Sequence, residues 1–416
     1  RPVAVRGEGW LPSTGRMAHP CGGGVRSEAS QRPGRTLDTV HKLARPVPPM
    51  PAPSPAPAHR RPVPRRRRLL RLLLIPATGL AVFVGVTLVP VLVAPGTDSP
   101  IARIAEWARE WGLGDAVTAG EQLQYQVSKP AEGGTLAGGI PTEGAFDRAL
   151  PPIPPRAQPA LPGEGQWQDL LSWHGRRVAQ VAFLRPDATH TAFSVGVVRM
   201  DATALRFALH QGTRVPGAPL VAPTSLTAAE RQTVLATFNS GFQMKDAQGG
   251  YWQNGTSVAP LVAGAASMVF THDGHLSVEA WPGGAPAGDV VAVRQNLALL
   301  VDHGRLNPQA TAGDDTAVWG KTVGNKAYVW RSAVGTRADG SVVFVVGPAL
   351  NVETLARLTL DAGCVESMEL DINTDWTNYL WYSKGATPHK LTPDEYPNPK
   401  RYLTASTRDF VAVLAR

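Results

Sequence analysis

The sequence predicts an α+β fold, in which a β-rich domain follows a basic tail and one transmembrane helix. Residues 166–416 carry short apolar and β-branched runs separated by Gly, Asn and Asp, which is the pattern of strands and turns. Only two segments in that region have explicit helix start signals. Upstream, residues 72–97 form an uncharged stretch rich in Leu and Val, which predicts a membrane-spanning helix.

Residues 1–68 are predicted to be a disordered basic tail on the cytoplasmic side. They are rich in Pro and show little hydrophobic periodicity, so they cannot bury enough apolar surface to offset chain entropy. Residues 1–71 hold 15 of the 41 basic side chains and 3 of the 33 acidic ones, which leaves 26 against 30 in residues 72–416. The positive charge therefore belongs to the tail, and we expect no nucleic-acid partner for the folded part.

Residues 69–95 are predicted to be a signal anchor. Leu72–Val93 supplies 22 residues, and about 20 apolar residues span a bilayer core. Arg65–Arg68 and Arg71 precede this stretch, and positively charged flanks stay cytoplasmic. We expect a single-pass protein of the cell membrane, with the lipid bilayer as a partner and the C-terminal domain outside. A cleaved signal peptide is the alternative, although its apolar region is usually about 7–15 residues.

Residues 96–165 are predicted to connect the membrane to the folded domain. Ile101, Ile104, Trp107 and Trp111 have the spacing of a short amphipathic helix, and Trp often lies at the membrane surface. A Pro- and Gly-rich segment follows, which is typical of a semi-rigid stalk. An irregular part of the folded domain is the alternative for this stalk.

Residues 166–416 are predicted to form the extracytoplasmic domain. The two helix signals are a capping box at Thr227–Glu230, which leads towards Val234, and Asn351 as the cap of a helix over Val352–Ala362 that ends at Gly363. The expected strands are Val178–Leu184, Thr191–Met200, Leu205–His210, Ala266–Phe270, Leu276–Trp281, Val290–Val293, Ala327–Trp330 and Ser341–Val346.

Motifs for several common enzyme classes are absent from the sequence. There is no GxSxG, HExxH, GxxxxGK[ST] or paired CxxC, so serine hydrolase, zinc protease, P-loop and zinc-ribbon functions lack support. Three polar clusters remain, each at or near the end of an apolar run: residues 237–243, residues 328–335 and residues 368–376. These clusters are the candidates for chemistry.

The third cluster has two interpretations from the residues alone. In a strand, Glu369, Asp371 and Asn373 share one face, with Asp375 as a further member. Stacked carboxylates raise each other's pKa unless a cation or a substrate joins them, so this face predicts a site; solvated acids at a strand end are the structural alternative. A divalent metal at Asp371, Asn373 and Asp375 is a second functional reading, although Trp376 stands where a calcium loop needs Gly. We expect no other cofactor.

Taken in order, the three clusters resemble the phosphodiester glycosidase family of the uncovering-enzyme type. The family's Asn-Gly-Gly-Phe-Phe turn corresponds to Asn239–Gln243, and its Arg-(Thr/Ser)-Ala-(Ile/Val)-Gly motif to Arg331–Gly335. An apolar strand that runs into a Gly turn corresponds to Gln295–Gly304, and the Leu-Asp-Gly-Gly-Gly-Ser strand end to Leu370–Thr374. The resemblance covers residues 235–382.

Two departures from the family pattern concern glycines. Ser240 replaces the first Gly of the Asn turn, and residues 372–374 replace the triple glycine. Because glycine lets a backbone approach a ligand closely, these changes predict a reshaped pocket, a different substrate or lost catalysis.

The resemblance implies a hydrolase that cleaves a sugar–phosphate diester, with an envelope glycan as a possible substrate. Its implied catalytic groups are Asp371, with Glu369 as second candidate, and Arg331 on the phosphate. A structural ion pair is the alternative for Arg331. The implied substrate-binding residues are Asn239, Gly241, Asn373, Asp375 and Lys321. A non-catalytic glycan-binding or envelope-organising module on the same fold is the alternative function.

Overall fold

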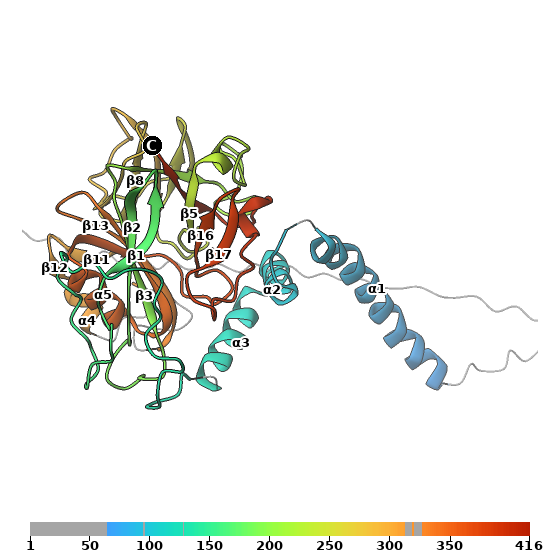
Figure 1. The fold of residues 1–416 in the computed structure, drawn as a ribbon. Helices are drawn as coiled ribbons and strands as arrows, with labels where there is room; N and C mark the ends of the chain where they lie inside the picture. Colours follow the sequence, from blue (N-terminus) through green and yellow to red (C-terminus); the bar gives the residue numbers. More distant parts are fainter. Residues whose placement is uncertain (1–64, 95, 128, 313–317, 320–326) are drawn as a thin grey trace, which may run out of the picture. The chain divides into compact units, whose positions relative to one another are not determined.

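The computed structural model describes residues 65–94, 96–127, 129–312, 318–319 and 327–416 (Figure 1). The expected tail lies outside the described residues up to residue 64. Three helices come first: α1 (Arg65–Val93), α2 (Pro100–Glu110) and α3 (Gly114–Val127). Within α1, residues 74–93 are long and apolar enough to cross a membrane, and none of that stretch is buried in the protein. The expected juxtamembrane helix corresponds to α2, which Ser99 caps by accepting a hydrogen bond from the Ala102 amide.

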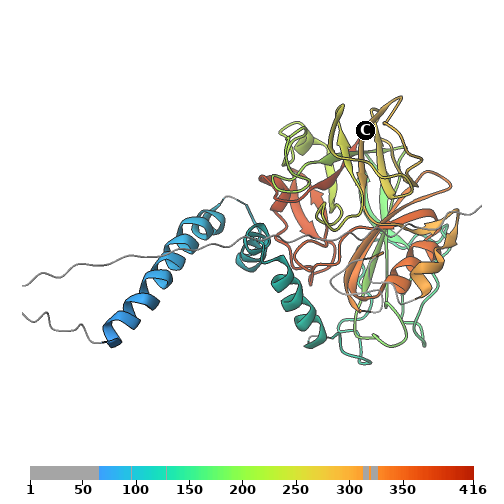
Figure 2. The ribbon, with the colours of Figure 1, turned by 180° about the vertical axis from the view of Figure 1, so that it is seen from behind.

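The remainder is a β-rich domain with few helices, as predicted, and the strands of its described residues form three antiparallel sheets (Figures 1 and 2). The largest has the order β1 (Gln168–Trp173), β2 (Arg176–Leu184), β3 (Val195–Met200), β14 (Val342–Leu350), β13 (Val329–Arg337), β15 (Cys364–Glu369), β11 (Leu299–Asp302) and β12 (Arg305–Leu306). The second has the order β7 (Thr256–Ala259), β6 (Tyr251–Gln253), β10 (Val290–Gln295), β8 (Ala266–Thr271) and β9 (Leu276–Ala280). The third has the order β17 (Thr387–Lys390), β16 (Tyr379–Ser383), β5 (Val234–Asn239), β18 (Phe410–Ala415) and β4 (Leu205–His210).

The central strands of the eight-stranded sheet are buried on both faces. In β14, Phe344 and Val346 pack in a core shared with the two smaller sheets, whereas Val343 and Val345 pack on the opposite face. The opposite face is covered by helix α5 (Val352–Asp361), beside which lies α4 (Pro308–Ala312). Strand β14 has no charged or hydrogen-bonding side chain, because neither of its faces meets water.

One of the two predicted helices is confirmed and the other is wrong. Asn351 caps α5 through the Thr354 amide at 2.7 Å, and Gly363 ends it with a φ of +86°. The Thr227 capping box forms its hydrogen bonds, but only a 3₁₀ turn over Glu230–Gln232 follows. Residues from Val234 onwards instead form β5, which is paired on both sides by β16 and β18; the pairing of this apolar run outweighs the local helix signal.

The predicted strands of the domain are confirmed with changed bounds. Leu205–His210 is β4 without change, whereas the strand expected at Thr191 begins only at Val195. The strand expected to end at Trp330 continues to Arg337. The Arg331 motif therefore lies inside β13, between β14 and β15, as expected for an arginine embedded in an apolar strand.

Candidate functional site

The structure joins the three polar clusters through Ser332. The side-chain nitrogen of Asn239, the last residue of β5, donates to Ser332 Oγ at 2.9 Å. The Asp371 amide also donates to Ser332 Oγ, at 3.2 Å, and the Ser332 amide donates to the Asp371 carbonyl oxygen at 2.9 Å. Segments that are about 90 and 40 residues apart in the sequence therefore meet at one buried point.

Residues 295–304, the further segment that matches the family pattern, also contact this buried point through Asn296. Asn296 donates to the carbonyl oxygens of Glu369 and Leu370 at 2.9 and 3.1 Å, and its side-chain oxygen accepts from the Phe242 amide at 3.0 Å. Gly241 lies against the Asn296 side chain so closely that a Cβ atom at this position would be 2.9 Å from it. Gly241 is therefore required by packing between the Asn turn and Asn296.

The Asp371 carboxylate is buried, with 2% of the residue exposed. Its Oδ1 accepts from the amides of Ile372 and Asn373 at 2.8 and 3.0 Å, and its Oδ2 lies 3.4 Å from Arg408 Nη2. Burial raises the pKa of Asp371 to about 6, and Arg408 and the two amides oppose part of that rise. A carboxyl pKa raised towards the working pH suits a general acid or base.

Two arginines that the sequence analysis did not identify lie against Trp376, and one of them, Arg408, lies beside Asp371. The guanidinium groups of Arg408 and Arg401 lie over the Trp376 ring, 4.6 and 4.9 Å from its centroid. Arg401 also donates to the Asp375 carbonyl oxygen at 2.8 Å. Both arginines are buried, yet Arg408 Nε and Nη1 and Arg401 Nε have no hydrogen-bond partner among the described residues. Buried donors of this kind indicate a place for an anion or ordered water.

These arginines lie beyond residue 382, where the resemblance ends. The sequence offered one signal for Arg408: Arg408 and Asp409 stand directly before the apolar run of β18. Two charged side chains at the start of a buried strand need partners inside the protein. Asp409 has one: its Oδ2 lies 2.7 Å from Arg294 Nε, and both side chains are fully buried. Asp409 also contributes to the raised pKa of Asp371.

Arg331 and Glu369 form a fully buried ion pair, with Arg331 Nη1 2.6 Å from Glu369 Oε1. Arg331 Nε also donates to the Leu350 carbonyl oxygen at 2.9 Å. Burial raises the pKa of Glu369 to about 7, although Arg331 opposes that rise. Because Arg331 and Ser332 are successive residues of β13, their side chains point to opposite faces of the sheet. The structure thus brings Asn239 and Asp371 together through Ser332, while Arg331 is paired with Glu369.

The remaining predicted residues follow Asp371 in the chain. Asn373 Oδ1 accepts from the Asp375 amide at 2.8 Å, and Asp375 Oδ1 accepts from Ser99 Oγ at 3.1 Å. Asp371, Asn373 and Asp375 thus use these oxygens for turn and helix contacts, and Arg408 lies beside the Asp371 carboxylate. Lys321 lies outside the described residues.

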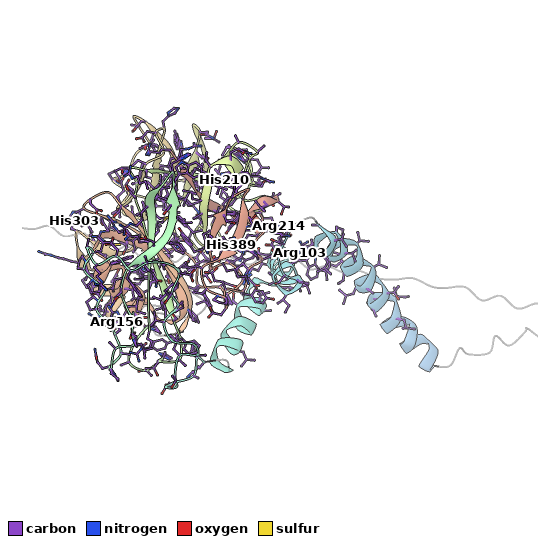
Figure 3. The ribbon with its side chains drawn as sticks, in the orientation of Figure 1. Arg103, Arg156, His210, Arg214, His303 and His389 are labelled. Carbon is purple, nitrogen blue, oxygen red and sulfur yellow. The ribbon has the colours of Figure 1, made fainter. Side chains whose placement is uncertain are left out.

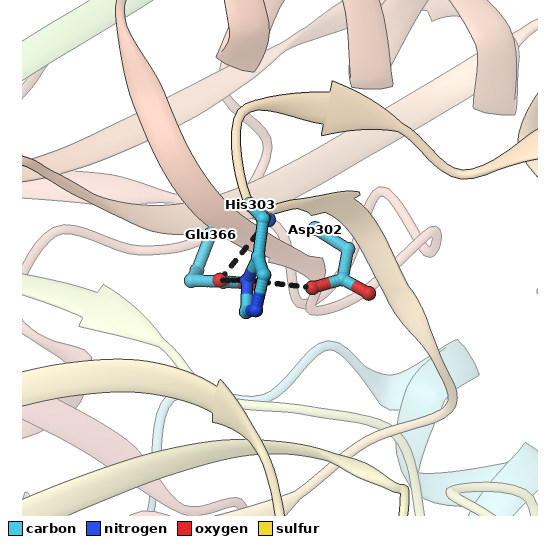
Figure 4. Close-up of side chains that lie close together, drawn as sticks. All are labelled: Asp302, His303 and Glu366. Carbon is cyan, nitrogen blue, oxygen red and sulfur yellow. Dashed lines mark hydrogen bonds and ion pairs between the residues drawn. The ribbon is translucent and has the colours of Figure 1, made fainter.

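A second polar cluster lies on the far edge of the eight-stranded sheet (Figure 4). Asp302, His303 and Glu366 place three potential metal-donor atoms within 4.8 Å of one another. His303 Nδ1 is 2.6 Å from Glu366 Oε1 and 3.1 Å from Asp302 Oδ1, and these acids raise the pKa of His303. Hydrogen bonds and ion pairs with the two acids thus join the three side chains at this edge of the sheet.

Comparison with known proteins confirms the resemblance. Residues 231–379 match the family described as phosphodiester glycosidase, and this match supports a hydrolase-like function. No curated protein matches the chain. Among solved structures, it is similar to the catalytic domain of zebrafish N-acetylglucosamine-1-phosphodiester alpha-N-acetylglucosaminidase, auto-inhibited by its pro-peptide, with 14% identity and a TM-score of 0.37 over 60% of this chain and 87% of that one. It is also similar to a hypothetical protein from Synechocystis, with 13% identity and a TM-score of 0.34 over 58% of this chain and 63% of that one.

Proposed function

We propose that the protein is an extracytoplasmic hydrolase of sugar–phosphate diesters, anchored in the cell membrane by α1. The observation that carries the proposal is the pairing of a buried carboxylate, Asp371, with Arg408, whose other donors are unpartnered among the described residues. Asp371 lies just after the end of β15, within the segment matched to the phosphodiester glycosidase family, and Arg408 comes to it from beyond that segment. A carboxylate and a cation at adjacent positions are the two groups that this reaction needs.

The cation binds the phosphate. A phosphodiester carries one negative charge, and a guanidinium group can hold two of its oxygens by parallel hydrogen bonds. Arg408 has two buried donor nitrogens for this purpose, and Arg401, which also lies over the Trp376 ring, has one more. We therefore assign the phosphate to Arg408 and Arg401 in place of Arg331.

The carboxylate acts at the anomeric carbon. Cleavage of the bond between this carbon and the phosphate oxygen produces oxocarbenium character in the sugar, which a nearby carboxylate stabilises. The leaving phosphate is a stable anion, so its protonation is less demanding than that of an ordinary alcohol. Asp371 stabilises the positive charge or takes a proton from the attacking water, and it does so in its ionised form.

The other predicted residues position these groups. Asn239 holds Ser332, which holds the backbone of Asp371, and Gly241 allows Asn296 to clamp the same strand end. The Arg331–Glu369 pair fixes β13 against β15 at this point. Asn373 and Asp375 shape the turn beyond Asp371 and contribute polar oxygens and nitrogens near the sugar.

The test is hydrolysis of a panel of sugar-1-phosphodiesters by the full-length protein in detergent. Release of free sugar that is abolished by Asp371→Asn and by Arg408→Ala supports the proposal. The matched controls are Asp289→Asn and Arg305→Ala, because both residues are exposed; these variants keep the wild-type rate. Equal turnover by Asp371→Asn and wild type would refute the assignment.

The alternative function is a glycan-binding module without turnover. It is favoured by Ile372, which stands in place of a family glycine and is buried in the core under α5. A binding measurement by calorimetry on the same panel separates the two functions. Saturable binding of a phosphodiester with no product after prolonged incubation favours the module.

A further inference from the structure

The segment that follows α1 contacts the candidate site directly. Asp98 Oδ2 accepts a hydrogen bond from Thr407 Oγ1 at 2.6 Å, and its Oδ1 lies 3.4 Å from Arg401 Nη2. The next residue, Ser99, donates to Asp375. Asp98 is nearly buried in these contacts, with 8% of its side chain exposed. The chain thus reaches the arginine pair of the site only five residues after the last residue of α1, Val93.

Arg103 holds this short connection in a compact form. Its guanidinium group donates to the carbonyl oxygens of Val91, Gly96 and Asp98 at 3.0, 2.9 and 3.1 Å, and to that of Ala94 (Arg103 is labelled in Figure 3). Five extended residues would span at most about 18 Å. The Arg103 guanidinium group binds carbonyl oxygens at both ends of the segment from Val91 to Asp98, so this segment is not extended. The distance from the end of α1 to the site is therefore shorter than about 18 Å, the span of an extended segment.

Helix α2 and the residue that follows it contact the C-terminal half of α1. Ile101 of α2 and Trp111, its C-cap residue, are 74% and 48% exposed. Trp107 Nε1 donates to Thr87 Oγ1 of α1 at 3.2 Å, and the Trp111 ring meets Phe83 of α1 edge-on at 4.6 Å. Apolar and Trp side chains next to a membrane span are typical of the lipid interface.

A cavity of about 360 Å³ lies between this segment and the site. Ser99 and Ala102 line one side, and Trp376, Arg401 and the half-exposed Tyr396 line the other. The cavity therefore lies between Arg401 and the segment that follows α1. A ligand in it would have its anionic group on Arg401 and an aromatic wall beside it.

We propose that the substrate is a sugar joined through its phosphodiester to a membrane lipid, held in the same bilayer as α1. This inference rests on the proposed hydrolase function and names its substrate class. The lipid chain stays in the bilayer, the phosphate lies at headgroup depth, where the Arg401–Arg408 pair is held, and the sugar extends outward. Water attacks the anomeric carbon, the bond from this carbon to the phosphate oxygen breaks, one proton of the water passes to Asp371, and the lipid phosphate leaves as a monoester anion.

The test compares two substrates with the same sugar phosphate, one carrying a long-chain lipid in phosphatidylcholine vesicles and the other a methyl group in solution. The full-length protein is reconstituted in the vesicles. We expect kcat/KM for the lipid substrate to exceed that for the methyl substrate at least tenfold. A ten-residue Gly/Ser insert between Gly96 and Thr97, combined with Arg103→Ala, frees the domain from the membrane and removes this advantage, while the methyl substrate keeps its rate.

The control is the same insert between Gly138 and Gly139, which lies downstream of α2 and leaves the connection to α1 unchanged. This variant keeps the preference for the lipid substrate. Equal kcat/KM for the two substrates, or a preference that survives the Gly96–Thr97 insert, would overturn the inference while the hydrolase function stands. Turnover of neither substrate would overturn the hydrolase function and the inference with it.

Discussion

Replacing Arg408 by Gln removes the positive charge that faces Asp371 and keeps a side chain of moderate size. Arg408 Nη2 lies 3.4 Å from Asp371 Oδ2, and Asp371 has a pKa of about 6 with Arg408 in place. In an environment of effective dielectric constant ~20, two charges about 4 Å apart interact by about 4 kcal/mol. That energy is an upper bound equal to about three pKa units, and acids beside an arginine are usually shifted by about one to three units.

The expected result is a rise of about one to two units in the pKa that limits activity on the acid side. Because Asp371 acts in its ionised form, wild-type kcat/KM falls as the pH drops through about 6. In Arg408→Gln the same fall begins at a higher pH. The plateau is also lower, by about 10- to 150-fold, since a hydrogen bond to a charged group contributes about 1.5–3 kcal/mol.

The assay is the pH dependence of kcat/KM for a sugar-1-phosphodiester between pH 4.5 and 9, with Arg305→Gln as the control. The shape of the profile reports on Asp371, and the height of the plateau reports on the phosphate contact. An Arg408→Gln profile with the midpoint of the wild type would refute the electrostatic argument. A shifted midpoint with an unchanged plateau would refute only the phosphate contact.

Three further predictions concern stability. Burial raises the folded-state pKa of Asp371 from 3.8 to about 6, so its contribution to stability is complete below the unfolded pKa and is lost as the pH rises through about 6. Asp371→Asn has no carboxyl group to ionise and does not lose this stability. In urea titrations, the unfolding free energy of Asp371→Asn relative to wild type therefore increases from pH 4 to pH 7, by at most about 3 kcal/mol. Glu369→Ala leaves the Arg331 charge buried without its carboxylate partner and is expected to cost about 3–5 kcal/mol, and a midpoint within error of wild type would contradict the buried ion pair. Gly241→Ala places a Cβ 2.9 Å from Asn296 and is expected to lower the melting temperature through about 1–3 kcal/mol of overpacking; an unchanged melting temperature by calorimetry would contradict the close contact.

Local sequence signals predicted the parts of the fold that depend on neighbouring residues. The helix from Val352 begins at its predicted Asn351 cap and ends at Gly363, because capping hydrogen bonds and a left-handed glycine act within a few residues. The capping box at Thr227 gave the opposite outcome. Its hydrogen bonds form, yet the residues that follow join a sheet, because β16 and β18 pair with Val234 and its neighbours.

In the candidate site too, contiguous motifs predicted which residues matter, and strand pairing decided which of them meet. The family motifs placed Asn239, Arg331 and Asp371 among the residues of interest, and an ion pair of Arg331 with one of the acids was the stated alternative that the structure shows. Alternation along a strand did not predict that Ser332 would join Asn239 and Asp371. That arrangement depends on the register of β13 between β14 and β15. Register is set by which apolar faces are buried against other parts of the chain.

By itself, the sequence determined the β-rich class, the apolar helix before the domain, the capped helix α5 and the identity of Asp371 as a candidate, since each follows from composition, short-range hydrogen bonding or a contiguous motif. Only the tertiary structure decided that Arg408 lies beside Asp371 and that Asp98 reaches Arg401. These contacts join residues 37 and 303 positions apart. Long-range packing of the sheets and of the segment after α1 brings these charges together, and no local property of the chain specifies it.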